Sequence, residues 1–401
     1  YREVNLPWLK AVPAHWEMQR NKNIFTEQKE IVGERSADYT LLSLTLNGII
    51  PRDMDGGGKF PESFDKYKIV KSGDMAFCLF DIDETPRTVG LSGYNGMLTG
   101  AYTIMRVSNI NARFIYYYYL ALDNSKMLRP LYTGLRKTIN INTFQSTKVP
   151  VPPRDEQDQI VRFLDWKVSG INKLINIRHK EISELNESLN TKLRDVLLSV
   201  PNVKEVPLKR ICSVPMTDGP HETPTFVDSG IPFVSAEASH DGRIHLDECR
   251  GFITREQHEV YCQKVRPQKN DIFIVKSGST TGKTVMVDFD DEFSIWSPLA
   301  LVRCNNLAMP RYVFFYCTSV MFQKQVRDNW SFGTQPNIGM GVLENLRLPL
   351  PEIEEQRAIV DTLDAYWSKV LQVKCNLKKQ IEELQSLKTR IIADAVTGKI
   401  D

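Results

Sequence analysis

The chain has 401 residues, of which 42% are hydrophobic and 25% are charged, a composition typical of a globular protein with two or three domains. Lysine and arginine number 51 against 49 aspartates and glutamates, which excludes a protein that binds nucleic acid through bulk positive charge. The seven cysteines include no C-x-x-C pair, and this argues against a disulfide framework or a zinc ribbon.

The first half of the chain predicts a globular domain followed by one long helix. Residues 1–148 mix short β-rich runs with turn dipeptides and one aromatic segment, RFIYYYYLAL, which predicts an α+β domain. Residues 155–198 contain no proline and carry acidic residues in the first turn, as a helix favours. The predicted apolar stripe of this helix has a period near 3.6 and consists of Ile160, Leu164, Val168, Ile171, Ile175, Ile182, Leu185, Leu189 and Val196.

The second half has the same internal order. Residues 201–347 carry strand-like runs such as DIFIVKSG and TVMVDF and the aromatic segment RYVFFYCTSV, and residues 354–396 predict a second long helix. Its apolar stripe keeps a period of 3.5 when Gln380 fills one skipped position, which is typical of a coiled-coil seam. The predicted seam residues are Ile359, Leu363, Tyr366, Val370, Val373, Leu377, Leu384, Leu387 and Ile391.

The two halves are also similar residue by residue. The segments VPVPPRDEQDQIVRFLD (149–165) and LPLPEIEEQRAIVDTLD (348–364) are identical at eight of the sixteen positions that begin at Pro150. Weaker matches upstream pair Asp74 with Asp271, Arg106 with Arg303, and Arg113 with Arg311. A repeat of this length is too long for a solenoid and predicts a tandem duplication of a domain with its helix.

The apolar stripes predict that the two helices pack against each other. A helix of this size is roughly 66 Å long at about 1.5 Å per residue, so neither stripe stays dry without a partner. Because the second domain follows the first helix directly, the second helix has to run back along the first. We expect an antiparallel coiled coil with one globular domain at each end, pseudo-twofold symmetric within a single chain.

Several motifs resemble the DNA-specificity subunit of type I restriction-modification systems. The doubled segment P-x-P-x-x-x-E-Q-x-x-I-V-x-x-L-D carries most of the similarity, which covers the whole chain. WLKAVPAHWE (8–17), DGPHETP (218–224), GIPFVS (230–235) and GTQPNI (333–338) add to it, although the first copy has no counterpart of DGPHETP.

The resemblance implies a fold and a set of partners. Residues 1–148 and 201–347 would be two target recognition domains, and residues 149–200 and 348–401 two conserved regions with spacer helices. Each domain would read one half of a bipartite site on double-stranded DNA. The chain would not itself be an enzyme and would need no cofactor; two modification (methyltransferase) subunits would bind around the helices, and restriction subunits would join the complex.

The loops between paired strands differ between the copies. The first reads DIDETPR (81–87) and is acidic before Arg87, whereas the second, KSGSTTGK (276–283), is basic and rich in hydroxyls. Because base edges are read by side chains on such loops, unlike loops predict two different half-sites. The candidate DNA-contacting residues are Lys276, Ser277, Thr280, Thr281 and Lys283, with Arg87, Arg136, Lys137, Gln335 and Asn337; a solvated hairpin turn and an amide-capped turn are the plain structural alternatives.

Signals of other functions are weak. SGSTTGKT (277–284) differs by one residue from a Walker motif, but an alternating strand pattern follows it where a phosphate loop would open a helix. His240, His245, Cys249, His258 and Cys262 fit no zinc spacing, so we expect no metal site. His221 has no neighbouring nucleophile placed by a motif. The tyrosine run 116–119 is expected in the core, not as a base-stacking surface.

Three classes of function therefore compete. They are a non-catalytic DNA-recognition scaffold, a P-loop nucleotide-binding protein, and a coiled-coil assembly protein without sequence readout. No segment has the about eighteen apolar residues of a membrane helix, and YREVNLPWLK has no signal-peptide pattern, so we expect a cytoplasmic protein. The duplicated domains favour the first class, because the third leaves them without a role.

Overall fold

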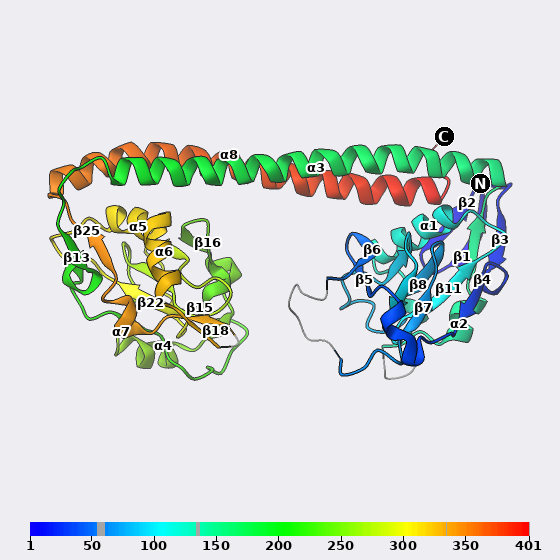
Figure 1. Ribbon diagram of the computed structural model, residues 1–401, viewed down its shortest axis with the longest axis horizontal. Coiled ribbons are helices and arrows are strands. Elements are labelled where there is room, and N and C mark those ends of the chain that lie inside the picture. The colour runs from blue at the N-terminus through cyan, green and yellow to red at the C-terminus, as the bar shows by residue number, and fades with distance from the viewer. Residues whose placement is uncertain (54–60, 134–136, 334, 401) are drawn as a thin grey trace. The chain divides into compact units, whose positions relative to one another are not determined.

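The computed structural model describes residues 1–53, 61–133, 137–333 and 335–400 (Figure 1). These residues form two compact units, one of Tyr1–Arg178 with Lys379–Asp401 and the other of His179–Lys378. Each unit contains a globular part and a segment of each of two long helices, α3 (Arg154–Leu197) and α8 (Ile353–Val396). Within the described ranges, none of the helices has the length and hydropathy that a bilayer crossing requires.

The first unit is built on a four-stranded antiparallel sheet in the order β4-β11-β8-β9. The short helix α1 carries the aromatic segment and packs on one face of this sheet. The elements of its globular part are β1 (Arg2–Leu6), β2 (Leu9–Val12), β3 (Glu17–Arg20), β4 (Phe25–Gln28), β5 (Leu42–Thr45), β6 (Gly48–Pro51), β7 (Lys68–Val70), β8 (Asp74–Phe77), β9 (Val89–Leu91), β10 (Gly96–Leu98), β11 (Thr103–Val107), α1 (Ala112–Asn124), α2 (Ile141–Ser146) and β12 (Lys148–Val151).

The second unit repeats this sheet and extends it. Its order is β14-β22-β19-β20-β17-β16, and the first four strands are again antiparallel neighbours. The elements of its globular part are β13 (Glu205–Pro207), β14 (Thr217–Asp218), β15 (Ile231–Val234), β16 (Ser239–His240), β17 (Arg243–Ile244), β18 (Gly251–Ile253), α4 (Arg255–Cys262), β19 (Ile272–Val275), β20 (Thr284–Met286), β21 (Ser294–Ile295), β22 (Leu299–Val302), α5 (Pro310–Thr318), α6 (Val320–Asn329), β23 (Ser331–Phe332), β24 (Pro336–Asn337), α7 (Met340–Leu343) and β25 (Arg347–Pro349).

The central strands are largely apolar because both faces of the sheet are covered. In β19, Ile272 and Ile274 pack with α5 and with residues of α8, whereas Phe273 and Val275 pack against a second core on the opposite face. In β8, Met75 and Phe77 face α1, and Ala76 faces the second core. The period of two in side-chain direction therefore sends alternate residues into two cores.

Matched residues make the same contacts in both units. Arg106 Nε lies 3.2 Å from Asp74 Oδ1, and Arg303 Nε lies 2.7 Å from Asp271 Oδ1. Both aspartates are buried, and each accepts a second hydrogen bond from a backbone N–H three residues earlier. Paired and hydrogen-bonded carboxylates can be buried at tolerable cost, and their recurrence confirms the duplication inferred from the sequence.

Each long helix starts with the same anchor. The buried Gln157 accepts the Asn111 N–H through Oε1 at 2.8 Å and donates to the Pro152 carbonyl at 2.8 Å. Gln356 accepts the Met309 N–H at 2.8 Å and donates to the Pro351 carbonyl at 2.9 Å. The Gln of the doubled Glu-Gln motif therefore links each helix start to the loop that precedes the aromatic helix.

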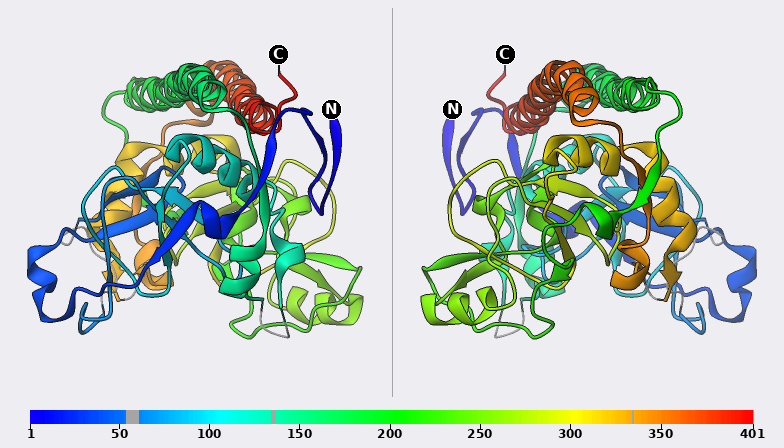
Figure 2. Two further views of the ribbon diagram at one scale, coloured as in Figure 1. Left: turned by 90° about the vertical axis from the view of Figure 1, so that its right-hand side faces the viewer. Right: turned by 90° about the vertical axis from the view of Figure 1, so that its left-hand side faces the viewer.

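The two long helices are antiparallel within each unit. In the first, Val161 and Leu164, early in α3, share a core with Ile392 and Val396, late in α8. In the second, Leu193, late in α3, shares a core with Leu363, early in α8. Figures 1 and 2 show the two helices side by side, and both views of Figure 2 place the last turn of α8 beside the N-terminal strands, where the Tyr1 hydroxyl donates to the Gly398 carbonyl at 2.6 Å.

The phase of the predicted seam is partly wrong. Val373 is 38% exposed, whereas Trp367 and Ile381 are buried in place of the predicted Tyr366 and the skipped Gln380. Trp367 packs edge-on against Phe314 of α5 at a centroid distance of 5.2 Å. The buried face of the helix therefore packs against the globular domain as well as against the partner helix. A periodicity that assumes only the partner helix predicts the wrong buried positions.

Candidate nucleic-acid interface

The structure brings together two segments that the sequence predicts separately. After β19, the Gly278 N–H donates to the Pro336 carbonyl at 3.1 Å and the Ile338 N–H to the Lys276 carbonyl at 2.8 Å. After β8, the Asp81 N–H donates to the Lys137 carbonyl and the Ile139 N–H to the Leu79 carbonyl. In both units, the loop after the third strand in the sheet order, β8 or β19, is thus hydrogen-bonded to a segment that precedes the last short helix.

In the second unit this junction carries small hydroxyls and amides. Ser279, Thr280, Gln335 and Asn337 are exposed, and Ser277 forms an isolated bridge with Asn337. Hydroxyl and amide side chains on exposed loops have the donor and acceptor groups that read base edges. Four of the predicted contact residues, Ser277, Thr280, Gln335 and Asn337, therefore belong to two segments whose backbones are hydrogen-bonded to each other.

Thr281 and Lys283, on the same loop, are less exposed than Thr280. Thr281 is 8% exposed, and its hydroxyl lies 2.8 Å from the Gly278 carbonyl and 3.0 Å from the Pro336 carbonyl. It therefore clamps the two segments together and is not available to DNA in this conformation. Lys283 lines a groove of about 430 Å³ with Thr280, Trp367 and Lys374.

Lys276 is held by a buried carboxylate. Its Nζ lies 2.9 Å from Asp218 Oδ2, and its side chain is 13% exposed. Asp218 belongs to the DGPHETP segment and also receives the Lys264 ammonium at 2.7 Å. Sequence reasoning missed this cluster because Asp218, Lys264 and Lys276 are far apart in the chain.

The corresponding loop of the first unit is built from charge pairs. Lys137 pairs with Asp83 at 3.2 Å and with Glu84. These bonds raise the pKa of Lys137, with that from Glu84 the larger, and the bonds from the Tyr132 hydroxyl and Lys137 lower the pKa of Asp83. The chemistry of this surface therefore differs from the hydroxyls and amides of the second unit.

Arg87 is a poor contact residue in this structure. Its guanidinium donates to Asp123 Oδ2 at 2.7 Å and to Asn124 Oδ1 at 3.0 Å, and its side chain is 14% exposed. The arginine fastens the loop to the end of α1 instead of projecting into solvent. Arg136, also predicted, lies outside the described residues.

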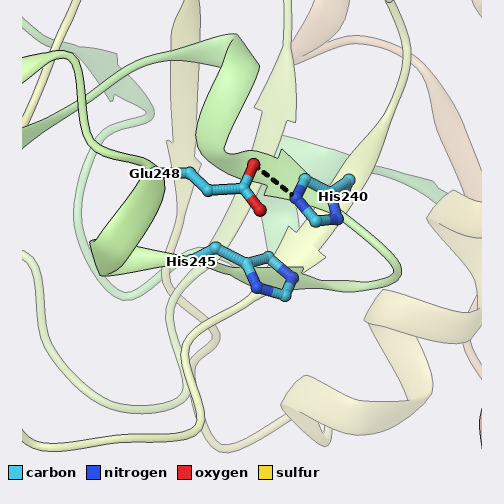
Figure 3. Close-up of side chains that lie close together, drawn as sticks. All are labelled: His240, His245 and Glu248. Atoms are coloured by element: carbon cyan, nitrogen blue, oxygen red, sulfur yellow. Dashed lines mark hydrogen bonds and ion pairs between the residues drawn. The ribbon is translucent and has the colours of Figure 1, made fainter. Parts of the chain in front are cut away.

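Three histidines of the second unit belong to two groups of possible metal ligands, and Figure 3 draws the first group. His240, His245 and Glu248 offer ligand atoms within 4.8 Å of one another. The two imidazole rings are stacked at 3.8 Å and 11°, so their in-plane lone pairs run side by side and do not converge on one ion. In the second group Arg266 donates to Glu292 at 2.7 Å beside the buried His258, which places a cation where an ion would sit. Cys249 belongs to neither group.

Two expectations about local structure are confirmed. Lys283 is followed directly by strand β20, so the Walker-like segment lacks the helix N-terminus that a phosphate loop requires. Tyr117, Tyr118 and Tyr119 are buried in the first core, and Tyr119 donates to Asn21 Oδ1 at 2.7 Å. The tyrosine run is therefore structural.

The architecture defines a duplicated α+β protein whose two sheets carry unlike strand-end loops. A family model described as type I restriction modification DNA specificity domain matches residues 79–186 and 202–383. The chain belongs to this family of DNA specificity domains. The two matches fall one in each half of the chain, as the duplication predicts.

Known relatives agree with this assignment, and a solved structure agrees with the fold. The type I restriction enzyme MjaVIII specificity subunit of Methanocaldococcus jannaschii is 23% identical over 100% of this chain and 97% of its own length. The putative type I restriction enzyme specificity subunit S.HindORF215P of Haemophilus influenzae is 26% identical over 69% of each chain. A chain from a structural study of complex assembly and conformational transition of the type I R-M system has a TM-score of 0.62, with 17% identity and coverage of 97% of this chain and 100% of its own, which supports the fold.

Proposed function

We propose that this chain is the DNA-recognition subunit of a type I restriction-modification complex, and that each globular domain reads one half of an asymmetric bipartite site. The observation that carries the proposal is the equivalence of the two strand-end junctions in backbone and their difference in side chains. One scaffold with two chemistries fits two different sequences on one duplex.

The domain limits follow the sequence repeat. Residues 1–148 and 201–347 are the two recognition domains, and residues 149–200 and 348–401 are the regions that contain the spacer helices. In the second domain, Ser277, Thr280, Gln335 and Asn337 are the proposed base and backbone contacts, because their two segments are hydrogen-bonded to each other and three of the four side chains are exposed. In the first domain, the proposed contacts lie around Lys137, which here is paired with two carboxylates.

The role of the chain in the complex is recognition without catalysis. Two modification (methyltransferase) subunits bind around the helices and restriction subunits join through them, in the cytoplasm where the DNA is. The near-neutral charge, 51 basic against 49 acidic residues, implies that the partner subunits supply much of the electrostatic attraction to double-stranded DNA.

A binding experiment tests the proposal. The chain is mixed with duplex DNA, with and without its modification subunits, in a gel-shift assay over a salt series. We expect a sequence-selective complex whose affinity falls steeply with salt, because phosphate contacts release counterions. A complex without sequence preference and without salt dependence would contradict the proposal and favour an assembly role.

A further inference from the structure

The DGPHETP segment (218–224) is held in a fixed position beside the second junction. Asp218 ends β14 opposite Ala300 of β22 and is 6% exposed. A Cβ atom at Gly219 would lie 2.1 Å from the Ile295 carbonyl oxygen, so no larger residue fits there. The Ser297 N–H donates to the Pro220 carbonyl at 3.2 Å. The backbone of the segment is thus pinned to residues 295–297.

The Asp218 carboxylate gathers three basic side chains. Oδ1 accepts from Lys264 Nζ at 2.7 Å, and Oδ2 lies 2.9 Å from Lys276 Nζ and 3.2 Å from His221 Nε2. Burial raises the pKa of Asp218, but the two ammonium groups more than offset this, and its pKa is lowered. The carboxylate is therefore ionised, and one negative charge faces two permanent positive charges.

Two of the three basic side chains of this cluster, Lys264 and His221, reach solvent, whereas Lys276 and the carboxylate are largely buried. The Lys264 side chain is 53% exposed and the His221 side chain 72%, against 8% for Asp218. An ammonium has three N–H donors, and among the described residues Lys264 Nζ donates only to Asp218. The cluster therefore presents a net positive charge and donors outward, which is the chemistry that binds a phosphodiester oxygen.

The first unit lacks this cluster. The Leu79 carbonyl accepts the Ile139 N–H, as the Lys276 carbonyl accepts the Ile338 N–H in the second unit. Leu79 therefore corresponds to Lys276, and an apolar residue replaces the cation. In the first unit Gln28 pairs with Ile104, as Thr217 pairs with Leu301 in the second unit. The residue after Gln28 is Lys29, which therefore occupies the position that corresponds to Asp218. The second domain alone carries the arrangement.

We propose that Lys264, Lys276 and His221 bind a backbone phosphate of the DNA next to the half-site that the second domain reads, with Asp218 as their positioning residue. The proposal rests on the proposed function and adds a phosphate site to it. Lys276 links the two, because its backbone pairs with Ile338 in the base-reading junction while its ammonium belongs to the cluster.

The test uses the full chain assembled with its modification subunits and two duplexes, one with the site mapped from methylated host DNA and one scrambled. Affinity is measured between about 50 and 200 mM salt. For Lys264→Met we expect weaker binding to both duplexes and a plot of log affinity against log salt that is less steep by about one. Lys264→Arg keeps the slope, and the matched control Lys269→Met, which removes an exposed lysine paired with Asp290, leaves both quantities unchanged.

Asp218→Asn separates positioning from bulk charge. The substitution removes a negative charge, so bulk electrostatics alone would strengthen binding to both duplexes. If Asp218 positions the cations, affinity for the mapped site falls about tenfold, while affinity for the scrambled duplex does not fall.

The outcomes distinguish the two levels of the proposal. An unchanged salt slope in Lys264→Met, with sequence-selective binding intact, overturns the phosphate site and leaves the proposed function standing. Wild-type complex that does not prefer the mapped duplex overturns the proposed function itself. A rise in affinity for the mapped site in Asp218→Asn overturns the positioning role.

Discussion

At the scale of single residues, the duplication is preserved where side chains tie the backbone together. Gln157 and Gln356 are both buried and both bridge a helix start to a neighbouring loop. Residues that face solvent at the strand ends differ between the copies. Structural side chains are therefore shared and exposed loop side chains are not, which is the pattern expected of one scaffold with two specificities.

Replacing Gln356 tests its structural role. Gln356→Leu leaves the Met309 N–H and the Pro351 carbonyl without their partner, and we expect a loss of about 1–3 kcal/mol in the free energy of unfolding. Gln157→Leu should cost a similar amount in the first unit. The measurement is urea unfolding, with Gln372→Leu on the exposed face of α8 as the control; equal stability of Gln356→Leu and this control would contradict the assignment.

Gln335 tests base reading. Its exposed amide lies in the second junction, and an amide that bonds a base edge contributes about 1–3 kcal/mol of discrimination. Gln335→Ala should relax the preference at one position of one half-site and leave the other half unchanged. Competition binding with single-base variants of the site measures this, and Asn329→Ala, at the end of α6, is the control. Identical base preferences in Gln335→Ala and wild type would remove Gln335 from the interface.

At the scale of elements, sequence periodicity predicts the existence and length of the helices better than their buried face. The predicted helix 354–396 agrees with α8 within one residue, because apolar spacing and the absence of proline act along the whole segment. The buried face is shared between a helix and a globular domain, as Trp367 demonstrates against Phe314. No single period describes such a face, and the predicted seam position of Val373 is therefore wrong.

The candidate site could be predicted only in part. The sequence places Ser277, Thr280, Gln335 and Asn337 on loops by turn chemistry, and the alignment of the copies pairs these loops. It does not reveal that Arg87 is ion-paired with Asp123 or that Asp218 is ion-paired with both Lys264 and Lys276. Those contacts depend on tertiary packing between segments distant in the chain, for which a single sequence carries no periodic signal.

A lysine in the helix pair gives a pH-dependent prediction. Burial lowers the pKa of Lys388, whose ammonium donates to Asn172 at 3.1 Å. The folded chain therefore binds this proton more weakly than the unfolded chain, so wild-type stability rises as pH increases from the folded pKa towards the ordinary lysine value. Lys388→Met should raise the urea midpoint at neutral pH, and the gain should shrink towards pH ~10 as the wild-type lysine becomes neutral.

The control for this prediction is Lys379→Met, which removes an exposed lysine from the same helix and should leave the midpoint unchanged at both pH values. A lower midpoint for Lys388→Met at neutral pH would mean that its bond to Asn172 outweighs the cost of burying the charge.

The helices as spacer give a second prediction at this scale. Four residues inserted after Arg178 and four after Lys378 lengthen α3 and α8 in step by about 6 Å, or roughly two base pairs at 3.4 Å each. We expect the tolerated spacer between the half-sites to grow while both half-sites stay the same. Mapping the methylated sites measures the spacer directly, and an unchanged spacer would contradict the proposal that helix length sets it.

At the scale of the whole molecule, one chain carries two readers that share a fold and differ in their loops. The family model matches once in each half, and both units repeat the same antiparallel sheet, helix anchor and aspartate–arginine pair. A homodimer would present the same loop twice and read a palindrome. A duplicated chain with diverged loops escapes that constraint, so we expect its target to be asymmetric.

The most direct test of this claim is to exchange residues 1–148 for those of a relative and to map the methylated sites of the wild-type and chimaeric complexes. We expect a bipartite, non-palindromic wild-type site and a chimaera in which one half-site changes while the other half and the spacer are retained. A palindromic wild-type site, or a chimaera altered in both halves, would contradict it.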